Sequence, residues 1–251
     1  PADYPQDQMY RELVAQHHDA IRCDDKIIGG ILARLKTDGL LESTIVIYFS
    51  DHGDYMGSHG VFNTKEHPHE ESVRIPAIFH WPGVIPAQGS RPEMFGLVDM
   101  APTTLGLIGV EPPAHVQGAD FSPALRDDDF TGPDAVLLEM CGNPRWGLDF
   151  LDWRGVVTEG WKYAHFETGH EMLFDLNADP HEQTNLAETN TEMRDTLKAR
   201  LLELLRDTRE PYFDVLIEHG VQMATPVLDV SGGQPGGIAP TWDGTIQFPD
   251  S

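Results

Sequence analysis

The strongest constraint on the fold of this chain is an unbroken apolar run that ends in a polar turn. Residues 44–49 read Thr-Ile-Val-Ile-Tyr-Phe, all β-branched or aromatic, without the alternation of a half-solvated strand. Such a run is typical of a parallel strand covered by helices on both faces. Ser50-Asp51-His52-Gly53 follows directly, and ligands of open α/β sheets gather outside the carboxyl ends of the strands. The sequence therefore predicts an α/β fold with a functional turn at Asp51 and His52.

The segments around this strand continue the alternation of helix and strand. Apolar residues at steps of three and four predict a helix over residues 8–37, which Gly39 ends by adopting the left-handed conformation. Further apolar runs predict strands near 77–81 and 95–98, and a helix follows at about 102–108. The first half of the chain is therefore expected to be βα material.

The second half has a different pattern. Residues 111–123 are rich in Pro and Gly and are interpreted as a connection. Short runs with Gly punctuation then predict a small antiparallel sheet, and leucines at helical spacing predict a helix over about 190–208 that lies on it. The predicted strands are 136–140, 155–158, 161–164 and 172–175. We divide the chain into an α/β part at 1–122, a small α+β subdomain at 123–210 and an extended tail at 211–251.

Composition excludes two classes of partner. The formal net charge is -24, with 17 Lys and Arg against 41 Asp and Glu. Nucleic acid and anionic membrane surfaces both require clustered basic residues, so neither is expected as a partner. No apolar run approaches the roughly 18 residues of a membrane-spanning helix. The two cysteines, Cys23 and Cys141, are too few for a disulfide framework.

Asp51 and His52 are the first candidates for chemistry. Neighbouring strand residues point to opposite faces, so both side chains can reach one ion only where the strand ends and turns, as Gly53 permits. A carboxylate and an imidazole suit Mn, Zn or Ca, and completion by further oxygens would favour Ca or Mg. The structural alternative is that Asp51 caps the turn and His52 is simply exposed. Lys65, in the loop that follows, could bind a tetrahedral anion as a point charge.

These residues together resemble a known family, the type I sulfatases. The resemblance covers about residues 8–208. It is carried by the following segments: Asp24-Asp25-Lys26-Ile27-Ile28-Gly29, residues 44–54, Gly57-Ser58-His59-Gly60, Lys65, Glu70-Glu71-Ser72, Arg74-Ile75-Pro76, Trp81-Pro82-Gly83, residues 97–103, Leu173-Phe174-Asp175-Leu176-Asn177, Asp179-Pro180, Glu182 and Asn185-Leu186-Ala187.

The resemblance implies an alkaline-phosphatase-like α/β fold, with a mixed or parallel sheet covered by helices and a small C-terminal subdomain of antiparallel sheet plus helix. It implies metal-dependent hydrolysis of a sulfate ester on a divalent cation, commonly Ca. The positions of Asp51 and His52 match metal ligands, and Lys65 matches a residue that contacts the sulfate. His59 could contact substrate, or could stabilise the loop by a hydrogen bond. The expected partner is a sulfated small molecule or carbohydrate.

The chain departs from the family pattern in one large respect. Sulfatases carry an N-terminal pair of metal-binding acids and a Cys or Ser in a Cys/Ser-x-Pro-x-Arg context that becomes formylglycine, and neither is visible here. Residues 141–145 are a near miss, with the proline one place late, and are rejected because a motif counts only in its structural context. We therefore expect an inactive portion that needs the missing N-terminal part of the same fold. Localisation stays open: the family is compatible with the periplasm or secretion, and the cytoplasm is an alternative.

Two functional alternatives stay open at this point. One is a phosphonate or phosphate ester hydrolase of the same superfamily, because the metal and anion residues would serve phosphate equally well. The other is a non-catalytic metal- or ligand-binding remnant. Among the other polar residues, Glu70, Glu71 and Arg74 are interpreted as fixing the long loop. His67 and His69 are taken as loop residues or distant substrate contacts. Trp146, Trp153 and Trp161 are taken as packing residues of the small sheet, with a role in lining a sugar site as the alternative.

Overall fold

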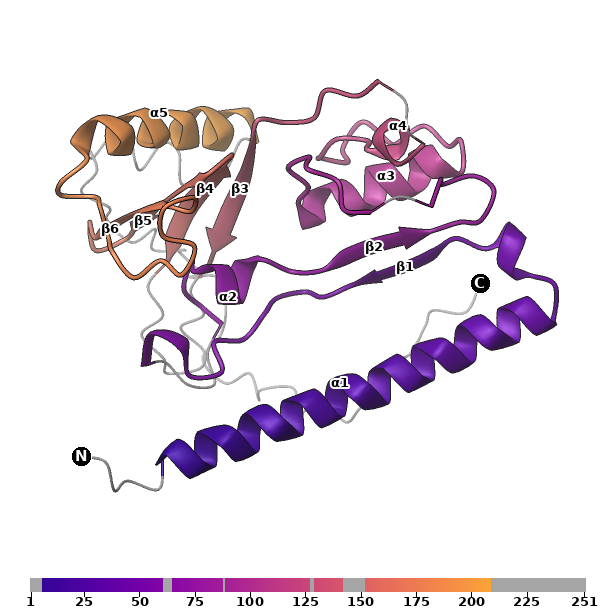
Figure 1. Ribbon diagram of the computed structural model, residues 1–251. Helices are drawn as coiled ribbons and strands as arrows, with labels where there is room; N and C mark the ends of the chain where they lie inside the picture. Colours follow the sequence, from indigo (N-terminus) through magenta and orange to yellow (C-terminus); the bar gives the residue numbers. More distant parts are fainter. Residues whose placement is uncertain (1–5, 61–64, 88, 127–128, 142–151, 209–251) are drawn as a thin grey trace, which may run out of the picture.

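The computed structural model describes residues 6–60, 65–87, 89–126, 129–141 and 152–208. Within these ranges the strands form two separate antiparallel sheets, a two-stranded pair and a four-stranded sheet (Figure 1). The α/β class predicted from the sequence is confirmed. The tail predicted at 211–251 lies outside the described residues.

The chain starts with a long helix, α1 (Gln6–Thr37), followed by the short 3-10 turn η1 (Leu41–Ser43). Gly39 has φ 70°, and the amide of Leu40 donates to the carbonyl of Leu35 at 2.9 Å, so the helix ends as predicted. Its apolar side chains are only partly covered: Ile21 is 50% exposed and Ile27 is 62% exposed. The described part of the chain therefore leaves an apolar helix face open.

The strand predicted at 44–49 is β1 (Val46–Phe49), which pairs antiparallel with β2 (Ala77–His80) in the register Val46↔His80. This differs from the parallel pairing that the apolar run predicts. Tyr48 is 42% exposed and Phe49 is 48% exposed, so no described helix covers this end of the strand. An unbroken apolar run signals burial on both faces and carries no information on strand direction.

The strand predicted at 95–98 is wrong. Those residues form a loop and the 3-10 turn η3 (Leu97–Asp99), which leads into α3 (Met100–Leu107). The buried Asp99 explains the difference, because its carboxylate accepts from the amides of Gly96 at 2.8 Å and Ala119 at 2.7 Å. A side chain that pairs with backbone amides in this way favours a turn over a strand. The connection expected at 111–123 holds one short helix at its end, α4 (Ser122–Leu125).

The antiparallel sheet and the helix predicted for the second half of the chain match the structure closely. Strands β3 (Ala135–Met140), β4 (Trp153–Thr158), β5 (Trp161–Phe166) and β6 (Glu171–Asp175) pair in chain order, all antiparallel. Helix α5 (Thr191–Asp207) lies across one face of this sheet (Figure 1). The core between them contains buried apolar residues from three strands and, at helical spacing, from α5: Val156, Tyr163, Leu173, Leu197, Leu201 and Leu205.

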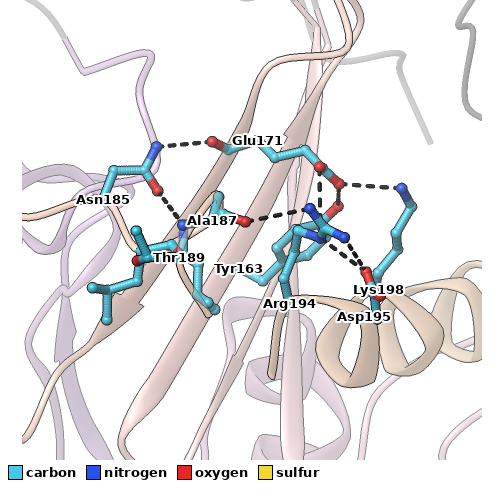
Figure 2. Close-up of polar contacts among 10 residues, drawn as sticks. Tyr163, Glu171, Asn185, Ala187, Thr189, Arg194, Asp195 and Lys198 are labelled. Carbon is cyan, nitrogen blue, oxygen red and sulfur yellow. Dashed lines mark hydrogen bonds and ion pairs between the residues drawn. The ribbon is translucent and has the colours of Figure 1, made fainter. Parts of the chain in front are cut away.

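A polar network closes the edge of this core. The carboxylate of Glu171 accepts from the hydroxyl of Tyr163 at 2.5 Å and from Lys198 of α5 at 3.1 Å (Figure 2). The side-chain oxygen of Asn185 accepts from the amides of Leu173 and Ala187, both at 3.0 Å. The segment between β6 and α5 is therefore tied to the sheet.

The other face of the small sheet is the one that matters for the site. Trp153, Ala164 and Phe166 form a second buried cluster, against which Val73 of the loop helix α2 (Glu70–Val73) packs. Figure 1 shows α2 at the end of β2, beside the four-stranded sheet. Both cysteines are free and exposed. None of the described helices has the length and apolar character that a membrane span requires.

Candidate functional site

The turn after β1 brings the side chains of Asp51 and His52 together. Oδ1 of Asp51 accepts from the amide of His52 at 3.0 Å, and Nδ1 of His52 lies 2.8 Å from the carbonyl oxygen of Gly53. A carbonyl can only accept, so this contact assigns a proton to Nδ1, and in the neutral imidazole Nε2 then carries the lone pair. Nε2 faces Oδ2 of Asp51 at 3.4 Å. In this tautomer two electron-pair donors face each other, which is an arrangement that a shared cation would satisfy.

The electrostatics of Asp51 suit a ligand of this kind. Its side chain is 83% exposed, and hydrogen bonds to the backbone of the turn, first of all its own, lower the pKa of its carboxyl below the usual value. The positive charge of Lys65 acts in the same direction. In the described part of the chain, no group of three or more His, Cys, Asp or Glu side chains is gathered to hold a metal ion. The donor set therefore fits a divalent cation in chemistry and is incomplete in number.

Gly53 joins this turn to α2. Its amide donates to the carbonyl of Ser72 at 2.7 Å, and a Cβ at this position would lie only 2.0 Å from the carbonyl oxygen of Glu71. Glycine is therefore required by the close approach of two backbone segments. The hydroxyl of Ser72 in turn donates to the carbonyl of Lys65. One helical turn thus contacts both the Asp51-His52 turn and the Lys65 segment.

Asp51, His52 and Lys65 line one cavity of about 510 Å³. Its opposite wall belongs to the small sheet and includes Trp153 and Glu139. The indole Nε1 of Trp153 donates to the carbonyl of Glu66 at 2.6 Å, so the sheet also holds the Lys65 segment directly. The sequence suggested Trp153 as a packing residue, and its burial is consistent with that; this hydrogen bond was not predicted.

His59 is placed differently. It does not line the cavity, and it has a positive φ of 55°. Its ring stacks on His69 with centroids 4.1 Å apart, and its Nε2 lies 3.5 Å from a carboxylate oxygen of Glu71. His69 is buried against Tyr55, whose hydroxyl lies 2.6 Å from Nδ1, and burial lowers the pKa of His69 to about 4. Of the two roles considered for His59, these contacts favour stabilisation of the loop, through ring stacking and charge, because its Nε2 makes no hydrogen bond to the described residues.

The loop-fixing role predicted for Glu70 has a basis that the sequence did not indicate. Arg74, the partner expected from the sequence, lies 3.8 Å from Glu70 and is 81% exposed. A closer partner is the fully buried Lys162 of β5, whose Nζ lies 2.7 Å from Glu70 Oε1 and 2.7 Å from Glu182 Oε1. The available signal was a lysine as the second residue of a predicted strand, since lysines are seldom buried unless paired. Trp146 and residues 142–145 lie outside the described residues.

Two family models match the chain. The model described as "N-sulphoglucosamine sulphohydrolase, C-terminal" matches residues 57–209, and the model described as "Sulfatase" matches residues 1–110. The first covers more than half of the chain, and the second includes the Asp51-His52 turn and Lys65. The two matches overlap over the loop and the strand that follow the turn.

Among the curated relatives is an N-acetylglucosamine-6-O-sulfatase of Bacteroides thetaiotaomicron, 30% identical over 212 residues that cover 82% of this chain and 37% of the relative. A solved structure of a protein in complex with its substrate D-glucosamine-2-N,6-O-disulfate is 29% identical, with a TM-score of 0.70, over 76% of this chain and 40% of that one. A phosphonate monoester hydrolase of Agrobacterium radiobacter is 26% identical, with a TM-score of 0.65, over 73% of this chain and 39% of that one. The chain thus spans less than half the length of these proteins. From the match to residues 57–209 and the likeness to these folds, the chain belongs to the sulfatase family.

Proposed function

We propose that the chain supplies the metal- and anion-binding part of a sulfuric ester hydrolase. The observation that carries the proposal is the shared cavity, in which two facing electron-pair donors, Asp51 and His52, lie with the cation Lys65. Membership of the sulfatase family suggests a sulfate ester as the ligand of these three residues. The sulfate group is anionic, and both a bound cation and a lysine can neutralise its charge.

In this proposal Asp51 and His52 hold a divalent cation, with Ca favoured over Mn, Mg or Zn. When bound, the cation would act as a Lewis acid on the sulfate oxygens. Lys65 adds a positive charge to the same group, and Asp51 keeps its negative charge over the working range because its carboxyl pKa is lowered. His59 is proposed as a loop residue that supports this arrangement without contacting the substrate. A sulfated carbohydrate or small molecule is the proposed substrate.

The metal site is tested by titrating Ca²⁺ and Mn²⁺ into the chain and measuring heat. Binding should be weak, because two protein ligands leave most of the coordination sphere to water. Asp51→Ala should reduce the affinity about tenfold or more, corresponding to the loss of roughly 1.4 kcal/mol. Asp38→Ala is the matched control, since it removes an exposed carboxylate at the end of α1, outside the cavity. Equal affinity in both variants would remove Asp51 from the proposed site, and no metal binding by the unsubstituted chain would favour a non-catalytic remnant.

We further propose that turnover requires an N-terminal portion of the same fold, which would carry the remaining acids and the formylglycine. Support comes from the apolar faces left open on α1 and on β1–β2, where Ile31 is 54% exposed and Ile78 is 56% exposed. Exposed apolar area of this extent usually marks an interaction surface. The described chain should show no hydrolysis of an aryl sulfate above a metal-free blank. We also propose the division into residues 1–122 and 123–210, with a separate tail.

A second candidate function has one specific observation in its favour. The likeness to a phosphonate monoester hydrolase structure extends over 73% of this chain, so the same cavity could serve a phosphorus ester. Parallel assays of an aryl sulfate and an aryl phosphonate, in a protein that carries both portions of the fold, distinguish the two. A preference for sulfate is expected, and a preference for phosphonate would replace the proposal.

A further inference from the structure

Lys162 is a buried charge with an unusual set of partners. Its side chain is fully buried, as is that of Glu182, and both Glu182 Oε1 and Glu70 Oε1 lie 2.7 Å from Nζ. The second oxygen of Glu182 accepts from the amide of Glu70 at 2.6 Å. Glu182 is thus linked to Glu70, the first residue of α2, in two ways: directly to the Glu70 amide, and through Lys162 to the Glu70 carboxylate.

The position of Glu182 is itself constrained. Its φ is 50°, in the left-handed region that non-glycine residues seldom adopt. Residues persist in this region only where surrounding contacts determine their conformation, and such residues concentrate near functional sites. Here the contacts of the Glu182 carboxylate with Lys162 and the Glu70 amide hold the residue in this conformation. Burying the two charged groups of Lys162 and Glu182 is also costly, so the arrangement is poorly explained as a simple contribution to stability.

The other side of α2 reaches the candidate site. Ser72 accepts from the amide of Gly53, which follows the two proposed metal ligands, and donates from its hydroxyl to the carbonyl of Lys65. The distance from Lys162 to the site is therefore bridged by one helical turn. A shift of α2 would move the Asp51-His52 turn and the Lys65 segment together, because Gly53 and Glu71 are too close to slide independently.

We propose that Lys162, with Glu182, is a positioning residue for the metal and anion site, and that it acts through Glu70 and α2. The small sheet thereby sets the relative placement of the two proposed metal ligands and the proposed anion-binding lysine. The effect of Lys162 on metal binding rests on the proposed function. Its effect on the position of the Asp51-His52 turn rests only on the contacts of α2.

The test measures amide exchange and metal affinity in the same 251-residue chain. Amide exchange reports on the positioning of the turn, and metal affinity reports on the proposed metal site. Glu70→Ala removes the side-chain link from Lys162 to α2 but leaves the residue 70 amide bonded to Glu182 and leaves Lys162 paired with Glu182, so the sheet should fold. The amides of Gly53 and Arg74 should exchange about five- to thirtyfold faster, the factor that corresponds to a modest local loss of stability. Amides of the β4–β5 ladder should be unchanged. Affinity for Mn²⁺ alone should fall about threefold or more, because a displaced turn must be reordered on binding.

Two further variants complete the design. Glu70→Gln retains an oxygen that can accept from Lys162 and should restore most of the protection of Gly53. Lys198→Met removes a lysine–glutamate pair from the opposite face of the same sheet, where the pair lies 3.1 Å apart, and should leave Gly53 exchange and Mn²⁺ affinity unchanged. Unchanged exchange of Gly53 in folded Glu70→Ala would overturn the positioning role. If exchange rises while Asp51→Ala leaves Mn²⁺ binding intact, the positioning role stands and the proposed metal site fails.

Discussion

Replacing the buried His165 with phenylalanine is expected to make the folded state less sensitive to acid. His165 lies on β5, is 3% exposed, and neither ring nitrogen is in hydrogen-bonding geometry with any side chain or backbone group in the described ranges. Burial lowers the pKa of its imidazole to about 4, and the positive charge of Lys198 acts in the same direction. Glu171 and the backbone of Phe166 oppose the shift without cancelling it.

The sign and size of the effect follow from proton linkage. The imidazole pKa in the unfolded chain is 6.5 and in the folded chain is about 4. Between these values the unfolded state binds more protons, so the stability present above about pH 6.5 is lost as the pH falls. At 1.36 kcal/mol per pKa unit the full difference is about 3 kcal/mol, of which about 2 kcal/mol is lost between about pH 7 and about pH 4.5.

The assay is urea unfolding followed by circular dichroism at these two pH values. His165→Phe should lose about 2 kcal/mol less of its free energy of unfolding than wild type across the interval, because the ring no longer takes up a proton on unfolding. His170→Phe replaces an exposed histidine of the same hairpin and serves as the control. Carboxylates and the buried His69 contribute to both proteins and cancel in the comparison. Equal losses in wild type and His165→Phe would refute the reasoning.

Three other predictions concern the small subdomain and its contact with the site. Leu201→Ala, at a side chain 1% exposed, should cost about 2–5 kcal/mol of unfolding free energy, and the half-buried Leu202→Ala clearly less, by urea titration; equal costs would contradict the packing of α5. Asn185→Ala leaves two backbone amides without their acceptor and should cost about 1–3 kcal/mol in the same assay, whereas Asn185→Asp should retain most stability. Trp153→Phe removes the hydrogen bond to the loop and should speed tryptic cleavage after Lys65, and an unchanged cleavage rate would argue against that anchor.

Local patterns were sufficient to predict the small subdomain. The short runs with Gly punctuation that became β4, β5 and β6 and the leucine spacing of α5 are properties of single elements, and each strand pairs with its neighbour in the sequence. The failure at residues 95–98 has a different origin. There the apolar run resembles a strand, but Asp99 satisfies backbone amides that are 3 and 20 residues away. A contact with a residue 20 positions later leaves no local pattern.

The candidate site could be predicted in part for the same reason. Asp51 and His52 follow a strand, which is a local signal, and Lys65 follows within the same loop. The contacts that connect them to the rest of the molecule join residues far apart in the sequence. Trp153 binds a carbonyl 87 residues away, and Glu182 binds an amide 112 residues away. Neither pairing can be inferred from residue type and spacing, although the lysine inside β5 indicated that a partner was needed.

The strand order of the small sheet has a consequence for how the chain folds. Because β3, β4, β5 and β6 pair in sequence order, the contacts of this sheet close only short loops, and such topologies form quickly. Lys162 and Glu182 are 20 residues apart and can meet during this early stage, whereas Glu70 must arrive from a distant segment. We therefore expect the subdomain to form first and to act as a template, so that the loop bearing Asp51, His52 and Lys65 takes its final conformation last.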